Sequence, residues 1–423
     1  MWTQLSYRTA QLGQHALQAW GSLADGITRI LLYRGRSFLA HHLAAHPQET
    51  AAKQARLDHI AQTLAGGGKV AFVVFRDLHW VDWFLPITSR LEAEFPDRVS
   101  VLYISYSSVL KRVGRGRNLM AYRQAIEARM KAAGVDPHSH FSHEEIPWYN
   151  NFPQPGAILT TEGIPQENFS SPHRVYVPHY FVLKARDVLP ANIRYNHLFC
   201  PAKPPFTYRE LDNPPPGLTV HRVGYPKMDA PPAEPVRLFA NPNPVVIYAP
   251  SLEVDILLDT LGQGLLELFQ RMAHLNFVVK LHPSLGSRRH PITRYFASRI
   301  HNGPNIVLDT TTSIQQLAPA SSLLIADYGS VGAEYRVSFG KRVIYLPVPS
   351  RLEGGSDLLF RDRFADAVTP VAGLEDAIGR LLAQGDLPPE QREEMGQALL
   401  YGYGHADLLA AHAVLKILEG KFD

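Results

Sequence analysis

The chain has 423 residues, 45% of them hydrophobic and 19% charged, which is the balance of a folded globular protein and excludes a largely disordered one. Its formal net charge of +3 is too small to indicate a nucleic-acid partner by itself. The single cysteine, Cys200, excludes an intramolecular disulfide and any multi-cysteine metal centre, and it favours a reducing cytoplasm.

The N-terminal segment, residues 1–50, is predicted to be helical, with arginines interleaved among large apolar side chains. A basic amphipathic segment of this kind can lie on an anionic membrane surface. Helices packed on the first domain or on a second subunit have the same pattern, so both interpretations stay open. No apolar run is long enough to cross a bilayer, and no signal peptide is recognisable. We therefore expect a cytoplasmic protein that is peripheral at the inner face of the cell membrane.

Short apolar runs alternate with helical stretches in the first half of the chain, which is typical of parallel β-α-β units. The predicted strands are 69–75, 99–105, 157–161, 174–180, 197–200 and 218–224. The predicted helices are 51–65, 79–94 and one that follows the basic loop 111–117. The histidine-rich stretch 138–145 is predicted to be an exposed loop.

The second half repeats this alternation after a proline-rich connection that ends at Pro244. Its predicted strands are 245–249, 277–281, 305–308, 322–326 and 342–346. Its predicted helices are 257–273, 291–300, 313–318 and 330–339, and two or three more helices end the chain.

These elements predict an α/β protein of two Rossmann-like, doubly wound domains that face a cleft, with an N-terminal helical extension. The expected units are the extension at 1–50, a first domain at 51–235, a second at 236–385, and C-terminal helices at 386–423 that pack back toward the first domain. Ligands of open parallel sheets bind at the carboxyl ends of the strands, so motifs at strand ends are the candidates for chemistry.

The stretch KLHPSLGSRR places His282 at one such strand end, where the following proline stiffens the exit of the chain. Ser284, Arg288 and Arg289 follow closely and could surround an anion. A histidine bonded to a nearby carbonyl, beside two solvated arginines, is the simpler interpretation of the same residues.

The stretch IADYGSVGAEY combines a strand, an acid and a helix that opens at Gly329 and Ser330. The amino end of a helix binds phosphate through its N–H groups and dipole, and glycine allows close approach of the backbone. Glu334, one turn into the helix, could accept hydrogen bonds from ribose hydroxyls. Helix capping by Asp327 or Ser330, with no ligand, would explain the same residues.

Three further motifs lie near predicted strand ends. GYPKMD could form the hinge between the halves and offer Lys227 to an anion. YAPSLE is a strand followed by a loop that carries Ser251 and could face a diphosphate. YVPHYF places His179 at a first-domain strand end, opposite His282, although a lone histidine is more often structural than catalytic.

Together these motifs resemble the CDP-glycerol glycerophosphotransferase family, the teichoic-acid primases and polymerases. GYPKMD, YAPSLE, KLHP and ADYGSVGAEYRVSFGKRVIYLPV stand in the order and approximate spacing of that family's pattern. The pattern reads roughly G-Y-P-R-x-D, Y-x-P-T, K-x-H-P and T-D-Y-S-S-x-x-x-D, followed by a helix and N-K-P-I-F-Y. The match spans 157–349 and is strongest over 221–347.

The resemblance implies a GT-B fold, a donor bound as a cytidine diphosphate ester in the second domain, and direct transfer to a lipid-linked acceptor without a metal or other cofactor. His282 matches the histidine of K-x-H-P and is implied to contact the donor phosphate or to act as an acid or base. Asp327, Ser330 and Glu334 match the acid, the second serine and the later acid of the D-Y-S-S motif. His179 corresponds to the histidine of a first-domain W-H-G motif, the implied base for the acceptor hydroxyl, although this chain has PHYF there.

The sequence also departs from the family pattern. Gly329 replaces the first serine of D-Y-S-S, and residues 251–253 replace a threonine-rich, often basic loop. The transferred group therefore stays open between glycerol phosphate and a sugar, since related GT-B capsule enzymes use CMP- or UDP-activated sugars.

The chemistry of such a transfer is consistent with these residues. A phosphate leaving group requires N–H donors and positive charge, and an acceptor hydroxyl requires a base that titrates near neutral pH. No D-x-D pair of acids stands at a strand end, so no metal is predicted. We expect a transferase that moves a phosphoalditol or sugar from a nucleotide-activated donor to a membrane-linked glycan, with no nucleic-acid partner. A nucleotide-sugar epimerase, or a nucleotide-sugar-binding factor that has lost the base, are the alternatives.

Overall fold

The computed structural model describes most of the chain after residue 68. The described residues are 58, 69–75, 81–105, 116–142, 156–161, 171–179, 195–207, 209–229, 234–282, 285, 290–300, 304–310, 312–327, 329–349 and 358–421. The helical segment predicted at 1–50 and most of the basic loop 111–117 lie outside them. Within the described part of the chain, no helix is long and apolar enough to cross a lipid bilayer.

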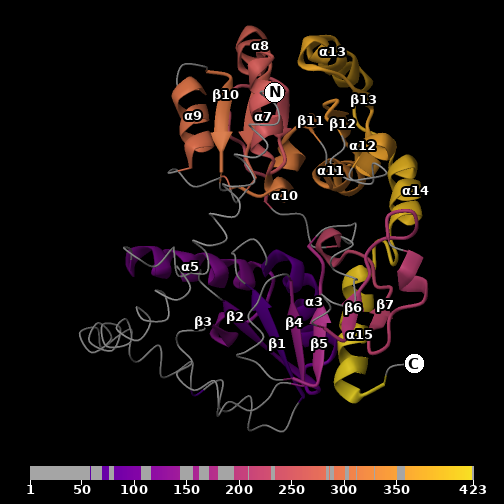
Figure 1. The fold of residues 1–423 in the computed structure, drawn as a ribbon. Helices are drawn as coiled ribbons and strands as arrows, with labels where there is room; N and C mark the ends of the chain where they lie inside the picture. The colour runs from indigo at the N-terminus through magenta and orange to yellow at the C-terminus, as the bar shows by residue number, and fades with distance from the viewer. Residues whose placement is uncertain are drawn as a thin grey trace, which may run out of the picture.

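Seven parallel strands form the first sheet, in the order β3-β2-β1-β4-β5-β6-β7 (Figure 1). They are β1 (Lys69–Phe75), β2 (Val99–Ser105), β3 (His140–Ser142), β4 (Ala157–Thr160), β5 (His173–Tyr176), β6 (His197–Phe199) and β7 (Thr219–His221). The chain adds β2 and β3 on one side of β1 and the later strands on the other, so the order reverses between β1 and β4.

Helices α3 (Val81–Glu94) and α5 (Gly116–Ala132) pack on one face of this sheet. Val73, Val101 and Leu159 point into this layer from three neighbouring strands and are fully buried. Their apolar burial explains why these strands were recognisable as short hydrophobic runs in the sequence.

Six parallel strands form the second sheet, in the order β10-β9-β8-β11-β12-β13, the order of a doubly wound dinucleotide-binding sheet (Figure 1). They are β8 (Val245–Ala249), β9 (Asn276–Lys280), β10 (Ile306–Asp309), β11 (Leu323–Ala326), β12 (Arg342–Tyr345) and β13 (Ala367–Val368). The order reverses between β8 and β11, which pair directly.

Helices cover both faces of the second sheet. Those that share a core with Val246 and Tyr248 are α7 (Val254–Gly262), α8 (Leu265–Arg271), α9 (Pro291–Ile300) and α13 (Leu374–Gln384). Those that share a core with Ile247 and Ala249 are α10 (Ile314–Leu317), α11 (Val331–Phe339), α12 (Leu359–Phe364) and α14 (Pro389–Leu399). Successive residues of β8 thus face opposite helical layers, and the predicted doubly wound α/β architecture is confirmed.

The structure corrects three local predictions. The helix predicted over 257–273 is two helices, because Gly264 adopts a left-handed conformation at φ +84° between them. The predicted exposed loop 138–145 contains β3, and His140 is buried there with its ring 3.0 Å from the Ser105 hydroxyl. The two residues of β13 were missed, because so short a strand shows no periodic pattern.

The C-terminal helix α15 (Ala406–Glu419) returns to the first sheet after the chain has completed the second (Figure 1). It packs against α3, and Ala410, Val414 and Ile417 are fully buried in the core of the first sheet. The return passes so close to the β7–β8 connection that a side chain at Gly224 would collide with the carbonyl oxygen of Tyr401.

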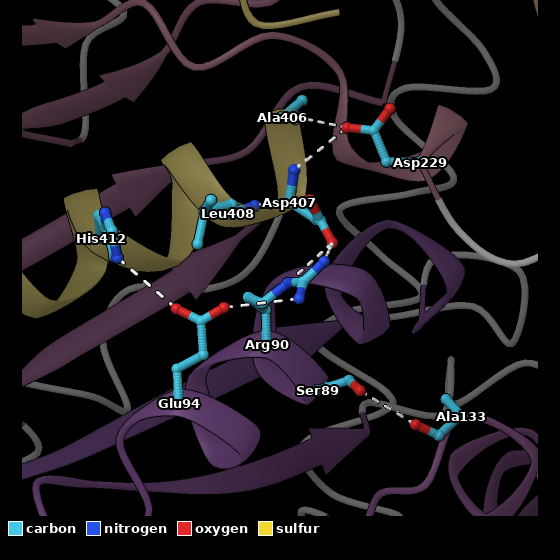
Figure 2. Close-up of polar contacts among 9 residues, drawn as sticks. All are labelled: Ser89, Arg90, Glu94, Ala133, Asp229, Ala406, Asp407, Leu408 and His412. Atoms are coloured by element: carbon cyan, nitrogen blue, oxygen red, sulfur yellow. Dashed lines mark hydrogen bonds and ion pairs between the residues drawn. The ribbon is translucent and has the colours of Figure 1, made fainter. Parts of the chain in front are cut away.

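Asp229, in the connection between the two sheets, caps the amino end of α15 (Figure 2). Its carboxylate accepts hydrogen bonds from the backbone N–H groups of Ala406 and Asp407, the second at 3.3 Å. Asp407 in turn pairs with Arg90 of α3 at 2.9 Å. Burial raises the pKa of Asp229 to about 6. The chain crosses between the sheets twice, after β7 and again before α15. The Asp229 carboxylate joins these two crossings.

We expect Asp229→Ala to destabilise the protein by about 1–2 kcal/mol, because two N–H groups at the start of α15 lose their acceptor. Asp229→Asn keeps an acceptor oxygen and should cost less. Asp259→Ala, at an exposed position of α7, is the matched control. Urea denaturation of the three variants measures the difference; equal stability of Asp229→Ala and the control would contradict the capping role.

Three histidines form a hydrogen-bonded row across β5, β6 and β7. His173 Nδ1 lies 3.1 Å from His197 Nε2, and His197 Nδ1 lies 3.1 Å from His221 Nε2. Each contact needs one ring N–H facing one bare nitrogen, so the row favours neutral imidazoles. Burial, and for His197 also the neighbouring rings, lowers the pKa of His197 to about 4, and burial lowers that of His221 to about 4.

The histidine row should therefore contribute a loss of stability on acidification. Imidazole has an ordinary pKa of 6.5, so between pH 6.5 and about 4 these rings bind more protons in the unfolded chain than in the folded one, and their contribution to stability falls as the pH falls through this window. His221→Phe removes one of the titrating rings and should make the loss of stability shallower. Denaturation midpoints at pH 7.5, 6.0, 5.0 and 4.5 test this; an identical pH dependence in both proteins would rule out the histidine row as a cause.

Candidate functional site

The candidate site begins where β8 and β11 end side by side, at the reversal of strand order in the second sheet. Asp327 directly follows β11 and is 1% exposed. Its carboxylate accepts hydrogen bonds from the backbone N–H of Ser251, at 2.9 and 3.0 Å, and from the Ser251 hydroxyl at 2.8 Å. The structure thus brings together two residues that the sequence placed in separate motifs, and Asp327 holds the loop that follows β8.

The amino end of α11 lies immediately beyond Asp327. Gly329 has φ +104°, a conformation that favours glycine, and its carbonyl accepts from the Tyr345 hydroxyl at 3.2 Å. Ser330 occupies the N-cap position, but its hydroxyl donates to Glu334 at 3.2 Å and accepts no capping hydrogen bond from a backbone N–H of the helix. The Ser330 side chain therefore does not cap α11, and the first N–H groups of a helix have no acceptor within it.

Glu334 forms an ion pair with Lys227, which belongs to the single-turn helix Pro226–Met228 between the sheets. The Lys227 ammonium lies 3.1 Å from the Glu334 carboxylate and 4.2 Å from the centre of the Trp83 ring. Both charged side chains are only 10% exposed. Lys227 was expected to face an anionic ligand, whereas here a carboxylate of the protein itself neutralises it.

Asp82, beside Trp83 in the first turn of α3, is a further acid near Lys227. Burial raises its pKa, and the positive charges of Arg129 and Lys227 act in the opposite direction. Arg129 lies 2.5 Å from the Asp82 carboxylate. Acidic groups from both sheets' helices therefore flank the Lys227 charge.

His179 lies three residues beyond β5 and is half-buried. The preceding backbone continues the sheet, because the N–H of Val177 donates to the Thr160 carbonyl at 2.8 Å. The Tyr225 hydroxyl donates to the His179 carbonyl at 3.0 Å, and the Trp83 ring meets the His179 ring edge-on at 6.2 Å. Trp83 contacts Lys227 as well, so the carboxyl edges of the two sheets meet around this group.

His282 lies at the same edge of the second sheet, two residues after β9, and is exposed. Strand β8 lies between β9 and β11, so the strands that carry His282 and Asp327 are about 10 Å apart. Burial lowers the pKa of nearby Lys280.

Ser284, Arg288 and Arg289 lie outside the described residues. Among the residues that the structure describes, no group of three or more histidine, cysteine or acidic side chains has the geometry of a metal site.

Sequence reasoning missed two residues of the site, Trp83 and Tyr225. The Trp83 indole N–H donates to the Tyr225 hydroxyl at 2.8 Å, and both side chains are buried. The only signal available was general: buried tryptophan and tyrosine need a hydrogen-bond partner, and GYPKMD contains such a tyrosine.

Comparison with known proteins supports the fold. No protein-family model and no curated protein sequence matches the chain. A structure from Listeria monocytogenes assigned as a UDP-N-acetylglucosamine 2-epimerase has a TM-score of 0.51 at 14% identity, covering 84% of this chain and 99% of that one.

Two further similar structures have lower scores. The UDP-GlcNAc 2-epimerase of Neisseria meningitidis bound to UDP-GlcNAc has a TM-score of 0.49 at 14% identity, covering 82% of this chain and 100% of that one. The wall teichoic acid polymerase TagF has a TM-score of 0.47 at 12% identity, covering 91% and 98%. The likeness to the Listeria structure establishes a GT-B-like α/β fold of two parallel sheets, and at such low identity it reaches no further than the fold.

The hydrogen bonds between Asp327 and the loop after β8 can be tested with two substitutions, one that removes a single hydrogen bond and one that removes all of them. Ser251→Ala removes the hydroxyl but keeps the backbone N–H bonded to Asp327, so we expect a loss of about 1 kcal/mol. Asp327→Ala removes the buried carboxylate, so that the N–H and the hydroxyl of Ser251 both lose this acceptor, and should cost about 2–3 kcal/mol. Chemical denaturation gives both values; a loss in Ser251→Ala as large as in Asp327→Ala would show that the backbone bond contributes nothing.

Proposed function

We propose that the protein is a transferase that moves glycerol phosphate, or a related phosphoalditol, from a CDP-activated donor to a hydroxyl of a membrane-linked glycan or polymer. The observation that carries the proposal is the clustering of Ser251, Asp327 and the amino end of α11 at the strand-order reversal of the second sheet. These residues belong to the motifs that resemble the glycerophosphotransferase family, and ligands of doubly wound sheets bind at such a reversal.

In this proposal the donor diphosphate lies at the amino end of α11, where Gly329 allows close approach and the N–H groups of the first turn donate to phosphate oxygens. The Ser251 hydroxyl already donates to Asp327, so toward a ligand it acts as an acceptor, suited to a ribose hydroxyl. Because Glu334 neutralises Lys227, the remaining positive charge is assigned to His282, Arg288 and Arg289, with Ser284 as a further donor.

The proposed reaction is a substitution at phosphorus. The acceptor oxygen forms a bond to the phosphorus that carries glycerol, while the bond from that phosphorus to the bridging oxygen breaks. CMP leaves with the bridging oxygen and its negative charge, which the amino end of α11 stabilises. The hydroxyl proton passes to His179, because imidazole titrates near neutral pH. The contacts of His179 with Tyr225 and Trp83, where the carboxyl edges of the two sheets meet, support this assignment.

A glycosyltransferase that uses a CMP- or UDP-activated sugar is the second candidate, favoured by Gly329 in place of the family's serine and by the altered loop after β8. An epimerase needs acids that act on the bound sugar, whereas Asp327 and Glu334 already hold partners within the chain. The basic segment 1–50 and the loop 111–117 are proposed to contact the anionic inner face of the membrane, where a lipid-linked acceptor would lie.

A donor panel tests the proposal. We expect CDP-glycerol or CDP-ribitol to raise the melting temperature by more than CMP-sugars or UDP-sugars do, because a ligand that binds the native state stabilises it. A response to UDP-sugars alone would replace the proposal with its glycosyltransferase alternative.

The two histidines should respond differently. His179→Ala is expected to lower the transfer rate about 100-fold or more while keeping the donor-induced thermal shift, because only the base is lost. His282→Ala should reduce the thermal shift as well as the rate. His274→Ala, at an exposed position before β9, is the matched control. Full transfer by His179→Ala, measured as CMP release, would remove His179 as the base.

A further inference from the structure

Tyr225 and Trp83 form a directed chain of hydrogen bonds that ends on the backbone of His179. The indole N–H of Trp83 can only donate, and it donates to the Tyr225 hydroxyl at 2.8 Å. The Tyr225 hydroxyl has one proton, which it donates to the His179 carbonyl at 3.0 Å. Tyr225 is 1% exposed, and its hydroxyl also lies within hydrogen-bond reach of the Glu334 side chain, so its partners belong to the chain and not to bulk water.

The same two aromatic residues connect to the donor side. Lys227, two positions after Tyr225, lies over the Trp83 ring and pairs with Glu334 in the first turn of α11. Burial first, and then the nearby Glu334 charge, holds the pKa of Tyr225 well above its ordinary value, so its hydroxyl stays protonated and available as a donor. A displacement of Trp83 would therefore disturb His179 directly, and α11 through Lys227 and Glu334.

We propose that Tyr225 and Trp83 are positioning residues that fix His179 relative to the amino end of α11. The inference rests on the proposed function, in which His179 is the base and α11 holds the donor phosphates. The hydrogen bond from Tyr225 is made to the main-chain carbonyl of His179 and not to its ring. It therefore fixes the backbone position from which the imidazole extends. The edge of the Trp83 ring packs against that imidazole at an interplanar angle of 86°.

A residue of this kind should affect turnover more than donor binding. Tyr225→Phe removes one hydroxyl and keeps the ring, so His179 loses its tether while the core stays filled. We expect kcat to fall about tenfold with the donor KM within about twofold, because small misplacements of a catalytic group lower the rate steeply. Tyr103→Phe, which deletes another buried hydroxyl that is bonded to Thr88 in the first sheet, should leave kcat unchanged.

A double-mutant cycle separates positioning from general stabilisation. In a His179→Ala background, Tyr225→Phe should lower kcat no further, because the group that it positions is gone. If Tyr225→Phe costs the same factor in both backgrounds, the inference is overturned while the proposed function stands. If His179→Ala alone transfers at the full rate, the proposed base fails, and the inference fails with it.

Trp83→Phe provides a second variant in case Tyr225→Phe folds poorly. It removes the indole N–H but leaves the Tyr225 hydroxyl able to reach His179, so a smaller loss of kcat with the same dependence on His179 is expected. Melting temperatures of all variants show whether a loss of rate merely follows a loss of fold. A rate loss that tracks melting temperature, in Tyr103→Phe as in the others, would contradict the positioning role.

Discussion

The buried charge of Lys227 constrains how the carboxyl edges of the two sheets meet. An ammonium group removed from water is costly unless an opposite charge or a π face replaces its hydration. Lys227 finds both, a carboxylate on α11 of the second sheet and an indole on α3 of the first. Each partner comes from a helix that follows a carboxyl strand end. Both edges that carry the candidate chemistry therefore supply a partner to the same charge.

Polar side chains at the carboxyl edge of the second sheet also find their hydrogen-bond partners within the chain. Asp327 is almost fully buried, and it accepts hydrogen bonds from the loop after the neighbouring strand. A ligand that enters this edge meets a backbone that is already ordered, which lowers the entropic cost of binding. Ser330 and Glu334, bonded to each other, extend that order into the first turn of α11. Preorganisation here arises from side chains that hydrogen-bond to one another without a ligand.

Much of the fold could be predicted because buried parallel strands appear as apolar runs. Strand 245–249 and helix 291–300 have the predicted bounds, whereas the two-residue β13 carries no pattern that a sequence can show. The members of the candidate site were recognisable where a motif follows a strand, as with Ser251 and Asp327. Their pairing was not, because Lys227 meets Glu334 across 107 positions of the chain and Trp83 meets Tyr225 across 142. Only the folded topology brings such residues together.

The position of α15 has a consequence for how the protein is made. The core of the first sheet contains Ala410, Val414 and Ile417, which are translated after every strand of both sheets. During synthesis, the first sheet can form its strand pairs early but must wait for this helix with an apolar surface uncovered. The nascent first half is thus open to chaperones and to misassociation for as long as the ribosome takes to complete the second half.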